Sequence, residues 1–198
     1  MKKYLLATLA AALFSANVYA DDIRLGEPSY GGSGCPAGTA SVSMGFDQKS
    51  ISVLFDQYLA MAGAGTGLQL DRKSCNLAIP VHVPQGYSIS VFEVDYRGYA
   101  AVPRGASGLF QVEYFFAGQR GPRAQRSFMG PYDRDFNINH GLAAEALVWS
   151  NCGEDVILRV NSSIMARSNR QMDDVLMSID SADVQSRLVY HVQWRRCR

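Results

Sequence analysis

Residues 110–116 read FQVEYFF, and this stretch decides the fold class. Phe110, Val112 and Tyr114 alternate with the polar Gln111 and Glu113. Successive side chains of a strand point to opposite faces, so strict alternation predicts a strand with one buried face. The same period of two recurs in LAIPVHV (77–83) and in LVYHVQW (188–194).

Turn signals separate these segments, including Pro84-Gln85-Gly86, Pro103-Arg104-Gly105 and Gly130-Pro131. Repeated strands and turns with few helical stretches favour an all-β fold of about nine strands. We expect a two-sheet antiparallel β-sandwich of jelly-roll or Greek-key type. The further segments with strand character are 40–45, 51–59, 87–102, 146–150, 155–166 and 174–180, whereas 140–148 (HGLAAEALV) could form one or two helical turns.

The composition indicates an ordinary globular domain. The chain has 198 residues, of which 47% are hydrophobic and 19% charged, with 19 Lys and Arg against 18 Asp and Glu. This length suits one domain. A net charge of +1 gives no bulk attraction for nucleic acid, so a nucleic-acid partner is not expected.

The N-terminus has the pattern of a secretory signal peptide. Lys2 and Lys3 precede the apolar run YLLATLAAALF (4–14), and SANVYA follows with small residues up to Ala20. The run is too short to span a membrane. We therefore expect a signal peptide at 1–20 that is cleaved near Ala20, a flexible leader at 21–34 and a single domain at 35–198. The mature protein would be secreted, either to the periplasm or to the extracellular space.

Four cysteines remain after this cleavage, namely Cys35, Cys75, Cys152 and Cys197. Exported proteins retain disulfides, and four cysteines permit three connectivities. Sequential pairing, Cys35–Cys75 and Cys152–Cys197, is favoured because it requires no crossing of the two halves of the chain. The sequence has no CxxC motif and its three histidines are scattered. Neither a metal site nor another cofactor is expected.

One aromatic and charged cluster is a candidate ligand site. Tyr96, Arg97 and Tyr99 lie close together in the sequence, and Gly98 between them suggests a bulge or turn that would direct Arg97 and Tyr99 toward solvent. Such side chains can stack on a sugar ring or contact a partner. The alternative is that the tyrosines pack at a sheet edge while Asp95 pairs with Arg97.

Two other sets of charged residues have weaker functional signals in the sequence. Arg120, Arg123 and Arg126 occupy GQRGPRAQRSF, which is more typical of a solvated hairpin loop than of an anion site. Glycoside hydrolysis requires two carboxylates that flank the scissile bond. The candidates are Glu93, Glu113, Asp133 and Asp135, but no sequence rule pairs them, so no catalytic residue is assigned.

Several strings resemble a known family. They include GCPAGT (34–39), DRKSCNL (71–77), FMGPY (128–132), LVWSNCG (147–153) and YHVQWRRC (190–197), and together they contain all four cysteines. The chain resembles the small secreted proteins of the domain-of-unknown-function 4360 family. The resemblance implies a secreted, cysteine-containing domain and supplies no catalytic residues.

The function that we expect is a non-enzymatic structural or binding module of the cell envelope or extracellular space. A polysaccharide or a cell-surface component is the expected partner. The alternative is a secreted carbohydrate-active enzyme or a carbohydrate-binding module.

Overall fold

The computed structural model describes residues 24–44, 50–141, 149–179 and 188–197. These residues form thirteen strands, and none of them is helical. The all-β class and the two disulfides expected from the sequence are confirmed. The strand number is larger than the nine or so expected. The segment 1–20, which the sequence predicts to be a signal peptide, lies outside the described residues.

The strands belong to two hydrogen-bonded sheets, and all strand pairs are antiparallel. Sheet 1 has the order β1-β6-β11-β8-β9, with β2 also pairing with β6. Sheet 2 has the order β3-β4-β13-β7-β12-β5, with β10 pairing with β7. Sheet 1 comprises β1 (Arg24–Leu25), β2 (Ser29–Gly31), β6 (Leu70–His82), β8 (Ser107–Phe116), β9 (Arg123–Met129) and β11 (Val156–Arg167). Sheet 2 comprises β3 (Ala40–Met44), β4 (Ser50–Phe55), β5 (Leu59–Ala62), β7 (Tyr87–Val102), β10 (Tyr132–Gly141), β12 (Val175–Ile179) and β13 (Leu188–Arg196).

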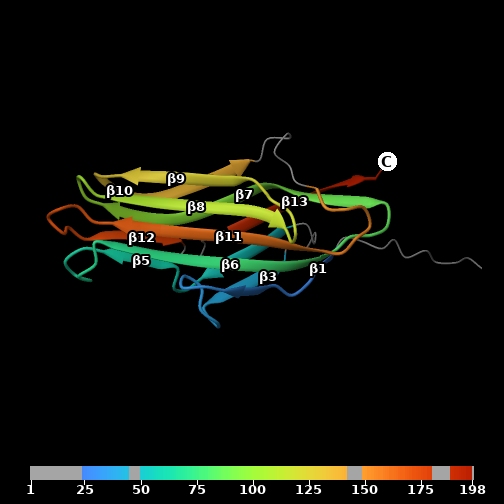
Figure 1. Ribbon diagram of the computed structural model, residues 1–198, viewed down its shortest axis with the longest axis horizontal. Coiled ribbons are helices and arrows are strands. Elements are labelled where there is room, and N and C mark those ends of the chain that lie inside the picture. Colours follow the sequence, from blue (N-terminus) through green and yellow to red (C-terminus); the bar gives the residue numbers. More distant parts are fainter. Residues whose placement is uncertain (1–23, 45–49, 142–148, 180–187, 198) are drawn as a thin grey trace, which may run out of the picture.

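Alternation of apolar and polar residues along the strands gives sheet 1 one buried face and one outer face. Figure 1 shows β6, β11 and β8 side by side along the length of the molecule. In β8 every second residue is buried, from Gly108 through Phe110 to Phe116, and the residues between them are half-exposed. β6 has the same pattern over Leu77, Ile79 and Val81. β13 also forms as expected, but the side chains of 188–194 lie outside the described part of the chain.

Side chains from both sheets meet in one core. The ring of Tyr96 from β7 lies 4.6 Å from the ring of Phe110 from β8. The hydroxyl oxygens of Tyr96 and Tyr114 are 2.6 Å apart, and both residues are buried. Burial raises the pKa of the Tyr114 hydroxyl well above its ordinary value, because the ionised phenolate would lose its hydration. This contact fixes sheet 1 against sheet 2.

β9 and β10 are among the strands that were not expected. Arg123 and Arg126 belong to β9 instead of a hairpin loop, and β10 follows directly after Gly130-Pro131. β9 is an edge strand in which Phe128 is the only buried residue, so its sequence shows little apolar alternation.

The prediction of helical turns at 140–148 is wrong for residues 140 and 141, because β10 extends to Gly141. The rest of that segment, 142–148, lies outside the described residues. No strand covers 149–150, the described part of the strand expected at 146–150.

The segment 21–34 also differs from a flexible leader where it is described. Arg24 and Leu25 pair with His82 and Val81 of β6, and Ser29–Gly31 pair with the same strand farther along. The residues from Arg24 onward therefore extend sheet 1.

Gly98 allows two segments to approach closely, and the sequence interpretation of a bulge there is wrong. β7 continues through Gly98 without a register shift. The pairing of β7 with β13 does shift, but at His191 and Val192 of β13, away from Gly98. A Cβ at Gly98 would collide with the carbonyl oxygen of Ser178 and lie 2.7 Å from the Phe136 ring.

We expect Gly98→Ala to lower the free energy of unfolding by about 1–3 kcal/mol, because the backbone of β12 must move away from β7. Equilibrium urea unfolding measures this change. Gly31→Ala is the control, since a Cβ there meets nothing within 4 Å. Equal stability of the two variants would contradict the close approach at Gly98.

Candidate functional site

The outer face of sheet 1 carries a depression of about 490 Å³. We call it the polar groove. It is lined by residues 72, 74 and 76 of β6, 111–113 of β8, 123–125 of β9 and 161–163 of β11. Four adjacent strands thus contribute to it, and most of the side chains are polar.

Strand register arranges these side chains in rows across the sheet. In one row, Asn161 lies between Asn76 and Glu113, and Glu113 lies opposite Arg123. In the next row, Ser163 lies between Ser74 and Gln111, and Gln111 lies opposite Gln125. Neighbouring strands are about 4.8 Å apart, so each row presents a polar group at regular intervals.

Hydrogen bonds hold several of these groups in place. Nε2 of Gln111 donates to Oε1 of Gln125 over 3.3 Å, and Nη2 of Arg72 donates to Oγ of Ser163 over 3.1 Å. Nε of Arg123 lies 3.0 Å from Oε1 of Glu113. A carboxamide has two N–H donors and a carbonyl acceptor, and a guanidinium has five donors. These contacts use only part of that capacity.

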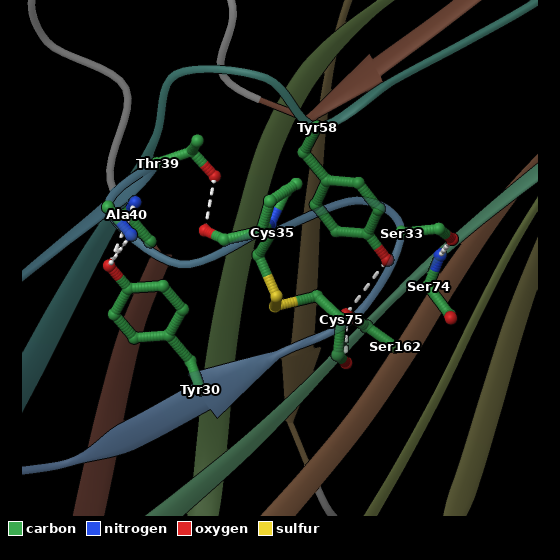
Figure 2. The surroundings of a disulfide bond; sticks show 11 residues. Tyr30, Ser33, Cys35, Thr39, Ala40, Tyr58, Ser74, Cys75 and Ser162 are labelled. Carbon is green, nitrogen blue, oxygen red and sulfur yellow. Dashed lines mark hydrogen bonds between the residues drawn. A yellow bond between two sulfur atoms is a disulfide. The ribbon is translucent and has the colours of Figure 1, made fainter.

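A disulfide and a buried tyrosine support the groove from below (Figure 2). Cys75 lies between Ser74 and Asn76 in β6 and is bonded to Cys35, and both sulfur-bearing residues are fully buried. Ser162 donates from Oγ to the carbonyl of Cys75 over 3.3 Å, so the Tyr58 hydroxyl, 3.0 Å away, donates to Ser162. Burial raises the pKa of Tyr58 above its ordinary value, which keeps this donor protonated.

The second disulfide lies at the end of the chain. Cys152 is bonded to Cys197, and the amide of Cys197 donates to the carbonyl of Gly86 over 2.7 Å. The hydrogen bond to Gly86 ties the end of β13 to the turn before β7, whereas the disulfide ties it to the loop before β11. Both pairings are those that the sequence favoured.

The candidate cluster of Tyr96, Arg97 and Tyr99 is divided by the sheet. Tyr96 is fully buried in the core and does not reach the surface. Arg97 and Tyr99 lie on the outer face of sheet 2, where the Tyr99 hydroxyl donates to the carboxylate of Asp133. This hydrogen bond raises the pKa of Tyr99, because the phenolate could not donate to a carboxylate. Asp95 accepts a hydrogen bond of 2.8 Å from Nδ2 of Asn139.

The four candidate carboxylates are distributed over both sheets. Glu113 is in β8 of sheet 1, whereas Glu93 is in β7 of sheet 2 and its side chain is not described. Asp133 and Asp135 are in β10. Arg123 is neutralised by Glu113 from the neighbouring strand, which the local sequence of the arginine segment does not indicate.

Sequence reasoning missed the polar groove, although part of its signal is present. The outward positions of the strands carry Ser74 and Asn76, Gln111, Asn161 and Ser163, where solvated strands often have Lys or Glu. No single strand makes a site from them. Only the register of β6, β11, β8 and β9 brings these residues together.

Two further features of the described residues bear on the site. No group of three or more His, Cys, Asp or Glu side chains among them is placed to hold a metal ion. In the same part of the chain, no helix has the length and apolar character needed to cross a membrane.

These observations define a class: an all-β domain with two disulfides, the covalent cross-links typical of exported proteins. The chain belongs to the family described as Domain of unknown function (DUF4360), whose model matches residues 21–197. It is 34% identical over 178 residues to an "Uncharacterized secreted protein" of Arthroderma benhamiae, covering 89% of this chain and 73% of that protein. Among solved structures, TmCBM61 in complex with β-1,4-galactotriose is 11% identical, with a TM-score of 0.28 over 86% of this chain and 88% of the other.

Proposed function

We propose that this protein is a secreted, disulfide-stabilised binding domain without enzymatic activity, and that its polar groove binds a polysaccharide of the cell envelope or extracellular space. The observation that carries the proposal is the set of carboxamide, hydroxyl and guanidinium groups in rows across four strands of sheet 1.

The chemistry of the groove suits a carbohydrate. Sugar hydroxyls both donate and accept hydrogen bonds, and the carboxamides of Asn76, Asn161 and Gln111 offer both kinds of group. A volume of about 490 Å³ lies within the range of ligand sites, but the lining is more polar than the lining of sites for apolar small molecules. The strands beneath supply a rigid support, which lowers the entropic cost of binding.

The enzymatic alternative has less support. Hydrolysis of a glycosidic bond requires two carboxylates. Among the described residues that line the groove, Glu113 is the only carboxylate, and Arg123 already holds it in an ion pair. A carbohydrate-binding module is therefore the more specific form of this proposal, and a carbohydrate-active enzyme is the alternative.

The finer points of architecture and export belong to the same proposal. Two sheets that share one core support a β-sandwich of jelly-roll or Greek-key type over 35–198 as the scaffold. The similarity to a secreted protein and the two disulfides support export after cleavage of residues 1–20 near Ala20. Arg97 and Tyr99 on the outer face of sheet 2 form the alternative surface, and their variants serve as the control that distinguishes it from the polar groove.

Affinity electrophoresis through gels that contain soluble polysaccharides tests this proposal. We expect at least one polysaccharide to retard the mature protein. The double variant Gln111→Ala/Asn161→Ala should bind about tenfold more weakly, because two hydrogen-bonding side chains at about 0.5–1.5 kcal/mol each are lost. The matched control is Arg97→Ala/Tyr99→Ala, which should bind like the wild type.

Three results would contradict the proposal. The first is the absence of retardation across neutral and acidic polysaccharides. The second is a loss of binding confined to the Arg97→Ala/Tyr99→Ala variant, which would place the site on sheet 2. The third is the release of reducing ends from a polysaccharide that depends on Glu113, which would show an enzyme.

A further inference from the structure

A second depression adjoins the polar groove on sheet 1. It has a volume of about 400 Å³, lies where β6 begins and β11 ends, and is lined in part by Leu70, Arg167 and Arg170. Arg167 lies opposite Leu70, and Met165, two residues earlier on the same face, lies opposite Arg72. Arg72 and Arg167 are therefore diagonal neighbours, for which Cα separations are about 7–8 Å. The two depressions therefore lie next to each other on sheet 1.

Positive charge exceeds negative charge along the polar groove and the second depression. In the groove, Glu113 neutralises Arg123 at 3.0 Å, whereas Arg72 donates a hydrogen bond to the neutral hydroxyl of Ser163. The described lining of the second depression includes Arg167 and Arg170 but no carboxylate.

Nearby acidic residues have other contacts. Lys73 neutralises Asp71, with its Nζ 3.2 Å from the carboxylate. Asp173 accepts a hydrogen bond of 2.7 Å from the neutral amide of Asn169, so one carboxylate keeps its charge at the edge of the second depression, against the three arginines. The whole chain is nearly neutral, with 19 basic and 18 acidic residues, so this excess of positive charge is local.

We propose that the polysaccharide in the polar groove is acidic, and that its carboxylates bind Arg72, Arg167 and Arg170 while its hydroxyls bind the carboxamides. This inference rests on the proposed function and specifies the ligand class. A planar guanidinium matches a carboxylate with two parallel hydrogen bonds, which a neutral sugar cannot use in the same way. A chain of uronic acids would supply carboxylates repeatedly along one direction, as the three arginines require.

The position of Arg72 favours this role. Its guanidinium donates a hydrogen bond from Nη2 to Oγ of Ser163, and Ser163 is only 7% exposed. One nitrogen of the guanidinium is therefore fixed to a buried group. The remaining N–H groups stay on a residue that is exposed at the groove. Exposed ion pairs are individually weak and are screened by salt, so this part of the affinity should depend on ionic strength.

Polygalacturonate and neutral galactan are the probes, compared by isothermal titration calorimetry at low and high salt with the mature wild-type protein. At low salt we expect polygalacturonate to bind about tenfold more tightly than galactan. High salt should remove most of this difference, because it screens the ion pairs and leaves the hydrogen bonds to hydroxyls.

The test variant is Arg72→Gln/Arg167→Gln, and the control is Arg97→Gln/Arg134→Gln, which removes the same charge from strands of sheet 2. The test variant should bind polygalacturonate no better than galactan, and the control should keep the wild-type preference. A preference that survives in the test variant, or equal affinity of the wild type for both polymers, would overturn the inference and leave the proposed function standing.

Dextran sulfate separates carboxylate recognition from general attraction to polyanions. Binding of dextran sulfate as tight as binding of polygalacturonate would overturn the assignment of a carboxylate ligand. If neither polymer binds, the inference is overturned, and an empty polysaccharide panel would then overturn the proposed function as well.

Discussion

Replacing Cys35 and Cys75 together by alanine is expected to lower the free energy of unfolding by about 2–5 kcal/mol and to weaken ligand binding in the polar groove. The disulfide joins residues 40 positions apart, so its removal gives the unfolded chain much more freedom. Cys75 also lies between two groove residues, and its carbonyl accepts the hydrogen bond from Ser162. The groove should therefore lose part of its preorganisation as well.

Cys152→Ala/Cys197→Ala is the matched control. This disulfide joins residues 45 positions apart, so the loss of stability should be similar. It links Cys197, just after β13, to Cys152 in the loop before β11, and it does not line the groove. Urea unfolding and affinity electrophoresis, performed on both variants, give the comparison. Equal loss of binding in the two variants would show that Cys35–Cys75 has no special relation to the groove.

Tyr96→Ala should lower the free energy of unfolding by about 3–5 kcal/mol, whereas Tyr99→Ala should change it by no more than about 0.5 kcal/mol. Tyr96 is fully buried, packs on Phe110 and makes a hydrogen bond of 2.6 Å with Tyr114. Its removal leaves a cavity in the core. Tyr99 makes its hydrogen bond to Asp133 at the exposed surface of sheet 2.

Equilibrium urea unfolding of these two variants separates a structural tyrosine from a surface tyrosine three residues away. A small effect of Tyr96→Ala would contradict the packing of β7 against β8. A large effect of Tyr99→Ala would show that the outer face of sheet 2 is covered by other parts of the protein.

Much of the fold can be predicted from the sequence, because a strand with one buried face has an apolar residue at every second position. The segment 87–102 agrees with the bounds of β7, and 155–166 differs from β11 by one residue at each end. β9 was missed because an edge strand buries little, and its arginines suggested a loop. The same alternation, continued through Gly98, would have placed Tyr96 inside and Arg97 and Tyr99 outside without a bulge.

The candidate site could be predicted only in part. Arg97 is exposed and Tyr99 is half-buried on the outer face of sheet 2, but Tyr96 is buried and not available to a ligand. The polar groove depends on which strands are neighbours. β6 and β8 are separated in sheet 1 by β11, which comes much later in the chain. Residues such as Asn76, Asn161 and Glu113 therefore become neighbours only through long-range pairing, which local patterns do not encode.

The most direct test of the polysaccharide-binding face is amide hydrogen exchange, followed by mass spectrometry, with and without a bound polysaccharide. We expect slower exchange in peptides that cover 72–76, 111–113, 123–125 and 161–163, the four strand segments of the polar groove. Protection confined to 95–101 of β7 and 133–139 of β10 would contradict this, because those residues belong to sheet 2.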